Sequence, residues 1–266
     1  DRVIIGTSSN KANSIMKKLY LPLVKKGGRY FHTSRRSAEL IKYASNAFLA
    51  TKITFINEIA NFCEKSNIDV KDIALGMGLD ERIGSRFLRP GPGYGGSCFP
   101  KDTRALTSVA KSFKTNLSIV KSVIKSNENR YKILITKVKN LLNNNLKNKK
   151  ITFLGVTFKA GTDDMRESPA LNLIPLLKKR GARISYYEPT GPKSEFRSKN
   201  IKFYTNVKNA CKNSDLIIIH SEWNEFKQLN FKKIVKKRNF KVFDMRNLYE
   251  PSEMKKGKIN YFGIGR

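Results

Sequence analysis

One glycine-rich segment of the sequence holds a cysteine, two cations and a carboxylate. Residues 87–102 read FLRPGPGYGGSCFPKD, so Cys98 follows four glycines and Asp102 comes four residues later. Glycines allow the backbone to approach a ligand closely and to offer N–H groups to phosphate or sugar oxygens. Arg89 and Lys101 add positive charge, and a helix is predicted to begin near Asp102. The segment is therefore a candidate binding loop for a phosphorylated sugar.

The same segment favours a reactive thiol. Positive charge and the start of a helix both stabilise a thiolate, which is the nucleophilic form of cysteine. Asp102 lies one helical turn from Cys98 and could act as a base or orient a water. The alternative is a structural glycine turn that carries a buried cysteine. The two other cysteines, Cys63 and Cys211, lie in helical apolar patterns and are predicted to be buried.

A lysine and an asparagine at a spacing of four residues form a second candidate pair. Lys42 and Asn46 share one face of a predicted helix, beside an apolar stripe. Such a pair usually lies on a solvated surface. At an active site, however, the ammonium and the amide could stabilise an alkoxide or another oxyanion.

The helices that would position these residues fill the first half of the chain. A strand is predicted at 1–9, a helix at 10–25 that ends at Gly27-Gly28, and a long helix at 37–65. Short helices and turns follow at 69–89, and further helices run from near Asp102 to about residue 145. A helix as long as 37–65 typically crosses a domain or forms the seam of a dimer. Residues 143–150 are polar and form a plausible linker.

Strands and helices alternate after residue 150. Strands are predicted at 151–154, 183–187, 201–204, 216–219 and 241–243, and helices at 168–180, 206–213 and 224–237. This alternation predicts a parallel sheet with helices on both faces, that is, a Rossmann-like, doubly wound α/β domain. Ligands of such sheets bind at the carboxyl ends of the strands. The polar residues of the loops at those ends are Lys159, Arg166, Glu188, His220, Glu222, Asp244 and Arg246.

Composition narrows the classes of function. The formal net charge is +32, which raises the possibility of a binding module for nucleic acid or another polyanion. The lysines are dispersed along the chain, however, and no RNA-binding motif or zinc-finger spacing occurs, so no specific nucleic-acid partner is expected. No apolar run approaches the roughly 20 residues of a membrane helix, and no secretory signal opens the chain. Three cysteines cannot form a closed disulfide framework, and a cytoplasmic location is expected. No metal site is predicted.

Four stretches resemble the UDP-glucose 6-dehydrogenases, members of the UDP-glucose/GDP-mannose dehydrogenase family. GYGGSCFPKD at 93–102 is similar to the catalytic-cysteine motif of these enzymes, and SAELIKYASNA at 37–47 to the helix that carries their catalytic lysine and asparagine. Phe158-Lys159 with DDMRESP at 163–169 resembles their nucleotide-sugar loop, and the ending YFGIGR at 261–266 is also similar. Ser97 and the FPK that follows Cys98 favour UDP-glucose over UDP-N-acetylmannosamine or GDP-mannose, the substrates of the sister enzymes.

The resemblance implies oxidation of C6 of UDP-glucose to the carboxylate of UDP-glucuronate, in two steps with NAD. By position, Cys98 would trap the aldehyde as a thiohemiacetal that is oxidised to a thioester and hydrolysed. Lys42 and Asn46 would hold the oxyanion, and Asp102 would transfer protons with an ordered water. Lys101 and Arg166 would reach the cofactor. The remaining substrate contacts would come from Phe87, Leu88, Arg89, Pro90, Gly91, Gly95 and Lys159, with Arg82 reaching a neighbouring subunit's site.

The expected domains are a remnant of an NAD-binding domain at 1–9, a helical central dimerisation domain at 10–145 and a Rossmann-like UDP-sugar-binding domain at 146–266. A G-x-G-x-x-G cofactor loop would precede Asp1 in this family; the glycines at 91–96 do not open a β-α-β unit and are not that loop. The chain alone is therefore expected to fold, to dimerise through helix 37–65 and to be inactive. The open alternatives are a sister sugar-nucleotide dehydrogenase and a polyanion-binding module.

Overall fold

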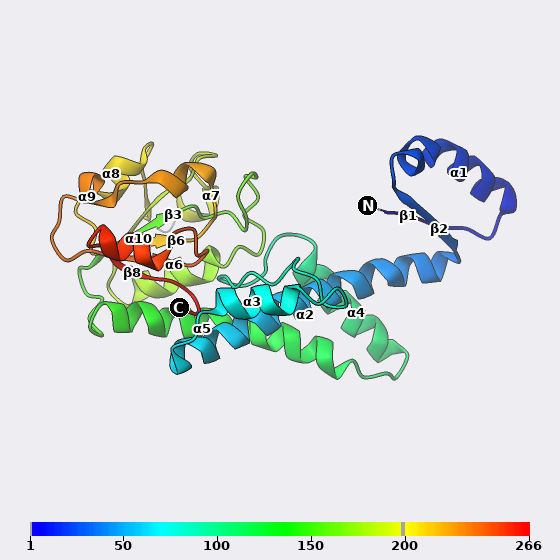
Figure 1. The fold of residues 1–266 in the computed structure, drawn as a ribbon, viewed down its shortest axis with the longest axis horizontal. Helices are drawn as coiled ribbons and strands as arrows, with labels where there is room; N and C mark the ends of the chain where they lie inside the picture. The colour runs from blue at the N-terminus through cyan, green and yellow to red at the C-terminus, as the bar shows by residue number, and fades with distance from the viewer. Residues whose placement is uncertain (1, 198–199) are drawn as a thin grey trace.

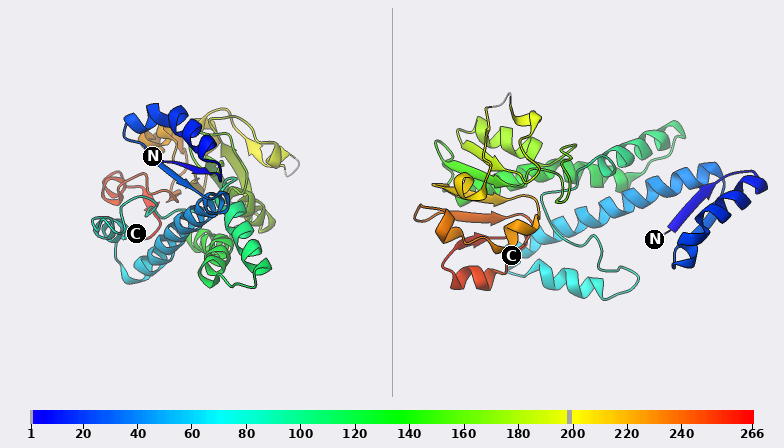
Figure 2. Two further views of the ribbon diagram at one scale, coloured as in Figure 1. Left: turned by 90° about the vertical axis from the view of Figure 1, so that its right-hand side faces the viewer. Right: turned by 90° about the horizontal axis from the view of Figure 1, so that it is seen from above.

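The computed structural model describes residues 2–197 and 200–266, which form an elongated molecule (Figure 1). A small β-α-β unit lies at one end and a six-stranded sheet lies at the other. One long helix crosses the space between them, and further helices run beside it (Figure 2). The expected architecture, a helical region followed by a parallel-sheet domain, is confirmed.

Residues 2–33 form a parallel β-α-β unit. Strand β1 (Arg2–Gly6) is followed by α1 (Asn10–Lys25) and β2 (Arg29–Thr33), and the two strands pair in parallel with Val3 opposite Tyr30. The strand and the helix were predicted, but β2 was not. Because β1 and β2 pair around α1, this unit favours a first domain boundary near residue 34 over one at residue 9. The division into domains remains a proposal.

Helix α2 (Arg35–Ser66) is the long helix that the sequence predicts at 37–65. It begins at Ser34, whose Oγ accepts the N–H of Ser37 at 3.1 Å, and it ends at Asn67 in the left-handed conformation (φ 56°). Polar capping at the start and a left-handed residue at the end are ordinary helix boundaries. One face of α2 is buried against its neighbours, whereas Phe48, Phe55 and Phe62 on another face are exposed.

Three helices complete the central region. They are α3 (Val70–Gly78), α4 (Phe99–Ser112) and α5 (Ser118–Leu141), and both α4 and α5 pack against α2. The glycine-rich segment 90–97 connects α3 to α4 without regular structure of its own. Helix α4 begins at Phe99 with Cys98 as its N-cap residue, three residues before the predicted start near Asp102.

The second half of the chain is a six-stranded parallel sheet with the order β5-β4-β3-β6-β7-β8. Its strands are β3 (Lys150–Leu154), β4 (Arg183–Tyr187), β5 (Lys202–Phe203), β6 (Leu216–Ile219), β7 (Lys241–Asp244) and β8 (Asn260–Phe262). The connecting helices are α6 (Ala170–Lys179), α7 (Ser194–Arg197), α8 (Val207–Cys211), α9 (Phe231–Ile234) and α10 (Pro251–Lys256), with a 3₁₀ turn at Asn224–Gln228.

The helix predicted at 224–237 is wrong. Leu229 is extended (φ −74°, ψ 126°) and separates the 3₁₀ turn from the four-residue α9. The side chain of Asn230 accepts the N–H of Lys233 at 3.1 Å and starts α9 as a new helix. An internal N-cap of this kind competes with a continuous helix, which explains the difference. The short elements α7, α10 and β8 were not predicted.

The sheet and the central helices share one hydrophobic core. Leu134 and Val138 of α5 pack with Phe153 of β3 and Leu173 of α6 in a single cluster of buried residues. The end of the chain also returns to the central region, where Gly265 accepts the N–H of Val70 at 2.8 Å. The two halves therefore share a core and a backbone hydrogen bond and are not independent. Among the described residues, no helix is long and apolar enough to cross a membrane.

Candidate functional site

Cys98 lies at the rim of a pocket of about 480 Å³ between the glycine-rich segment and the sheet domain. The cysteine is exposed, and its carbonyl accepts the N–H of Asp102 at 2.8 Å in the first turn of α4. Five of the residues predicted to bind the substrate line the same pocket: Phe87, Arg89, Gly91, Gly95 and Lys159. The alternative of a buried structural cysteine is wrong for Cys98, whereas Cys63 and Cys211 are buried as predicted.

Asp102 is the buried centre of a polar cluster beside Cys98. Its side chain is fully buried; Oδ2 accepts the amide of Asn46 at 2.6 Å and lies 3.8 Å from Lys42 Nζ. Lys101 Nζ donates to the other carboxylate oxygen. Burial raises the pKa of Asp102, but the hydrogen bonds from Lys101 and Asn46 and the charge of Lys42 outweigh it, so that the pKa is lowered overall. The carboxylate is therefore ionised at neutral pH and holds both predicted oxyanion-binding residues.

The glycine-rich segment is fixed from behind by two buried side chains. Asn57 Oδ1 on α2 accepts the N–H of Gly91 at 2.8 Å, and Arg130 Nε on α5 donates to the carbonyl of Gly91 at 2.6 Å. Burial lowers the pKa of Arg130 to about 10, which still leaves it charged at neutral pH. The peptide group of Gly91 is thus held on both sides. Neither Asn57 nor Arg130 was singled out in the sequence.

Two glycines of the segment lie directly against the loop that follows β3. A Cβ at Gly95 would collide with the carbonyl oxygen of Glu167, and a Cβ at Gly96 (φ 79°) would lie 2.8 Å from the ring of Phe158. The N–H of Gly96 also donates to the carbonyl of Arg166 at 2.8 Å. These contacts require glycine, and they place the sheet-domain loop 158–167 over the pocket that Cys98 borders.

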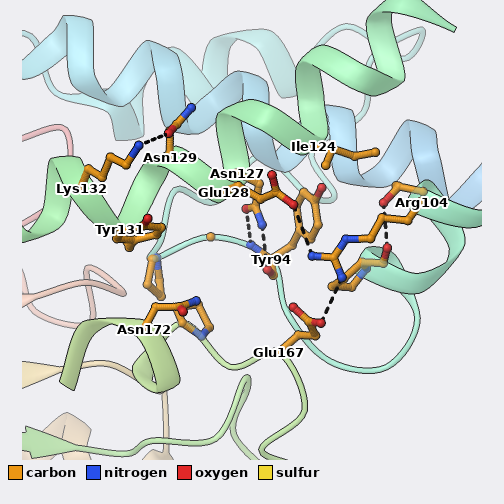
Figure 3. Close-up of a pocket in the computed structure, with 15 residues that line it drawn as sticks. Tyr94, Arg104, Ile124, Asn127, Glu128, Asn129, Tyr131, Lys132, Glu167 and Asn172 are labelled. Carbon is orange, nitrogen blue, oxygen red and sulfur yellow. Dashed lines mark hydrogen bonds and ion pairs between the residues drawn. The ribbon is translucent and has the colours of Figure 1, made fainter. Parts of the chain in front are cut away.

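A second pocket of about 490 Å³ lies near the glycine-rich segment (Figure 3). The side chain of Asn127 bridges the N–H and the carbonyl of Tyr94 at 2.9 and 3.1 Å. Arg104 of α4 forms ion pairs with Glu167 at 3.0 Å and with Glu128 at 3.4 Å, and so joins α4, α5 and the sheet domain. Lys132, the other cation of this pocket, donates to Asn129 at 2.8 Å, and both anions are paired with Arg104, so we interpret the pocket as part of the support of the segment.

Other predicted site residues lie at the margin. Leu88 is buried, and Pro90 lies in an adjoining pocket together with Phe87 and Arg89. Lys159 Nζ lies 5.5 Å from the ring centre of Phe158. Arg82 lies outside the Cys98 pocket and pairs with Asp80 at 2.7 Å. Its expected role in a neighbouring subunit's site is not tested by a single chain.

The two residues predicted to reach a cofactor are exposed cations near the thiol. Arg166 pairs with Asp164 at 2.8 Å, and Lys101 pairs with Asp102. The side chains of Lys101 and Arg166 are 62% and 70% exposed, so both keep donors free for an external anion. The hydrogen bond to Asp102 raises the pKa of Lys101, and the hydrogen bond to Asp164 raises the pKa of Arg166.

Glu222 and Arg246 are pocket residues to which the sequence gave no role. Arg246 Nε lies 2.9 Å from Glu222 Oε2, and the guanidinium donates to the carbonyls of His220 at 2.8 Å and Phe158 at 3.0 Å. Burial lowers the pKa of Arg246, although Glu222 opposes that effect. Both residues follow strands at the carboxyl edge of the sheet, where ligands of such sheets bind. The sequence therefore placed both near a binding site but did not indicate that they contact each other.

Two domain models of one family match the chain. The central domain of the UDP-glucose/GDP-mannose dehydrogenase family matches residues 36–129, and its UDP binding domain matches residues 152–251. The chain belongs to this family. A UDP-glucose 6-dehydrogenase of Rickettsia prowazekii is 42% identical to it over 269 residues, which is 100% of this chain and 62% of that protein.

Solved structures of the family share the fold. A UDP-glucose dehydrogenase from Pyrobaculum islandicum has a TM-score of 0.87 at 30% identity, and the similar region covers 100% of this chain and 59% of that one. A UDP-D-ManNAc dehydrogenase from Pyrococcus horikoshii has a TM-score of 0.82 at 27% identity, with coverages of 100% and 60%. The chain thus spans about three fifths of these relatives, and the shared fold alone does not separate their substrates.

Proposed function

We propose that this chain provides the thiol and the UDP-sugar part of an active site that oxidises UDP-glucose to UDP-glucuronate. The observation that carries the proposal is the position of Cys98, exposed at the pocket that the glycine-rich segment lines and next to the buried cluster of Asp102. Family membership supports a sugar-nucleotide dehydrogenase. The segment around Ser97 and Phe99 favours UDP-glucose; a sister substrate is the alternative.

The sugar nucleotide would lie along the glycine-rich segment. Backbone groups of residues 87–91 and of Gly95 would contact it, and Lys159 and Arg246 would face its charged groups from the sheet domain. The peptide of Gly91 is held by Asn57 and Arg130, so these backbone groups are oriented before the ligand binds. Preorganised donors cost little reorganisation on binding, which is why a rigid loop suits this role.

Cys98 would act as the nucleophile in the second half of the reaction. Its Sγ would add to the C6 aldehyde, with the thiol proton passing to the oxygen, and give a thiohemiacetal. Loss of a hydride from C6 and of the proton from its hydroxyl group would then leave a thioester. Water would then attack the thioester carbon and release the carboxylate and the free thiol. Lys42 Nζ, 3.8 Å from Asp102 and 64% exposed, and the amide of Asn46 would stabilise the oxygen anion of C6. Asp102 would orient the attacking water.

The positive charge on the outer side of this site matches the negative charge of a nicotinamide cofactor. NAD, when bound, would accept a hydride from C6 in each oxidation. Lys101 and Arg166 are exposed cations that would bind the phosphates of the cofactor. The turn from β1 to α1, residues 7–9, contains no glycine, since Gly6 is the last residue of β1, and the G-x-G-x-x-G spacing at 91–96 does not follow a strand. We therefore propose that the chain alone does not reduce NAD.

We further propose a cytoplasmic homodimer with UDP-glucose as its small-molecule partner. Phe48, Phe55 and Phe62 recur every seven residues on α2 and are 66%, 46% and 63% exposed. An apolar stripe of this kind supports pairing through the long helix.

Alkylation of the cysteines tests the proposal. Iodoacetamide should label Cys98 at least about tenfold faster than Cys63 and Cys211, because it is exposed and lies among cations. Burial raises the pKa of the Cys211 thiol to about 12, which suppresses its thiolate. UDP-glucose should slow labelling of Cys98 more than GDP-mannose does. Equal labelling of the three cysteines would contradict the role of Cys98, and stronger protection by GDP-mannose would favour a sister enzyme.

A further inference from the structure

A basic hollow lies on the sheet domain at the edge opposite to the Cys98 pocket. It has a volume of about 650 Å³ and is lined by the first residues of β3, β4 and β5 and by the end of α8. The Cys98 pocket, by contrast, is reached from loops that follow the strands. Ligands bound in the two places would therefore lie at opposite ends of the same strands.

Four cations from separate elements surround this hollow. Lys150 begins β3, Arg183 begins β4, Lys202 begins β5, and Lys212 follows α8. No aspartate or glutamate is among the described residues that line it. The nearby Asp215 pairs with Lys237 at 2.6 Å and Lys149 at 3.9 Å, and its other carboxylate oxygen accepts the backbone N–H of Lys150 at 2.8 Å. Among the described residues, no ion pair joins a carboxylate to any of the four cations of the hollow.

Part of this cation cluster is held in place. Lys150 Nζ donates to the carbonyls of Ala210 at 2.8 Å and Lys212 at 2.7 Å, and it lies 5.2 Å from the ring centre of Tyr204. Lys202 Nζ lies 4.9 Å from the same ring. Burial lowers the pKa of Lys150, and the nearby charges of Lys202 and Arg183 add to that effect.

We propose that this hollow binds a small anion with two or more phosphate groups, such as inorganic pyrophosphate or the polyphosphate of a free nucleotide. Its volume matches that of small-molecule sites. The cations surround one concavity, whereas a nucleic acid would require a charged track along the surface. Asn209 and Asn213 at the rim add amide donors. The proposal is independent of the function assigned to Cys98.

Titration calorimetry of residues 1–266 with inorganic pyrophosphate tests the site, with saturating UDP-glucose present. Binding should persist under that condition and should weaken about tenfold in the double variant Lys202→Gln/Lys212→Gln, since each substitution removes one charge-assisted contact. The control is Lys232→Gln/Lys233→Gln on α9, which removes the same charge at exposed positions elsewhere and should leave binding unchanged.

Three results would overturn the proposal. Equal weakening in both double variants would mean general attraction to a basic protein. Loss of pyrophosphate binding when UDP-glucose is present would place the anion in the Cys98 pocket. The third result is a single-stranded oligonucleotide that displaces pyrophosphate and binds more tightly than pyrophosphate does. If that oligonucleotide binding required Lys202 and Lys212, the hollow would be a nucleic-acid contact.

Discussion

Asn46 Nδ2 donates a hydrogen bond of 2.6 Å to Asp102 Oδ2. This bond joins two helices, although the two residues are 56 positions apart in the sequence. Asn46 comes from α2, and Asp102 lies in the first turn of α4, directly after the cysteine. The bond therefore fixes the long helix with respect to Cys98. It also gives the buried carboxylate a donor that does not depend on pH, beside the ammonium groups of Lys42 and Lys101.

The first prediction concerns Asp102 and pH. Its folded-state pKa is lowered, so its ionised form stabilises the folded chain above the ordinary pKa of about 4. That contribution is lost as the pH falls through the lower, folded-state value. The wild-type chain should be more stable than Asp102→Asn at pH 7, and the difference should shrink below about pH 4. Urea unfolding of both chains from pH 7 to pH 3 measures this, and a constant difference would contradict it.

The second prediction concerns the two residues that hold Gly91. Arg130→Met should lower the free energy of unfolding by about 2–3 kcal/mol, because the buried carbonyl of Gly91 loses its donor. UDP-glucose binding should weaken as well, since the backbone that lines the pocket loosens. The control is Lys132→Met, which changes an exposed residue two positions further along the same helix. It should alter neither the free energy of unfolding nor the affinity for UDP-glucose.

Urea titrations and calorimetry would measure both effects of Arg130→Met. If the variant lost stability but bound UDP-glucose like the wild type, Arg130 would be a structural residue only, and the Gly91 peptide would not be part of the binding surface. Asn57→Ala, which removes the acceptor of the Gly91 N–H, would then also lower the free energy of unfolding and leave UDP-glucose binding unchanged.

The third prediction concerns the exposed stripe of α2. The double variant Phe48→Ser/Phe55→Ser should shift the chain from dimer to monomer, because it removes two large apolar side chains from the proposed seam. Phe113→Ser is the control, since Phe113 is 77% exposed at the end of α4. Sedimentation velocity over a range of concentrations distinguishes the species. A wild-type chain that sediments as a monomer at every concentration would rule out this interface.

The sequence predicted the elements with strong periodicity and long runs. Helix α2 was located to within two residues, and the sheet strands β3, β4 and β6 were located closely, because each is a short run dominated by apolar or aromatic side chains. The strand β8 has three residues, and β2 alternates little between apolar and polar side chains. Such elements form through pairing with a distant strand, which leaves little local signal.

The candidate site was predictable where spacing placed its residues together. The four-residue steps from Lys42 to Asn46 and from Cys98 to Asp102 fix each pair locally, although only the fold brings the two pairs into contact. Arg130 holds the carbonyl of Gly91 from 39 positions away, and nothing near Arg130 in the sequence indicates that contact. The ion pair of Arg246 and Glu222 is likewise a product of two adjacent strand ends.

The central claim is that Cys98 forms a covalent bond to C6 of the sugar nucleotide, and carbon-13 NMR tests it directly. The C6 aldehyde of UDP-glucose, labelled at C6, would be added to residues 1–266 without cofactor. We predict a new thiohemiacetal carbon signal that is present in the wild type and in Cys63→Ser, and absent in Cys98→Ser. The same signal in Cys98→Ser, or no signal from a wild-type chain that binds the aldehyde, would contradict the claim.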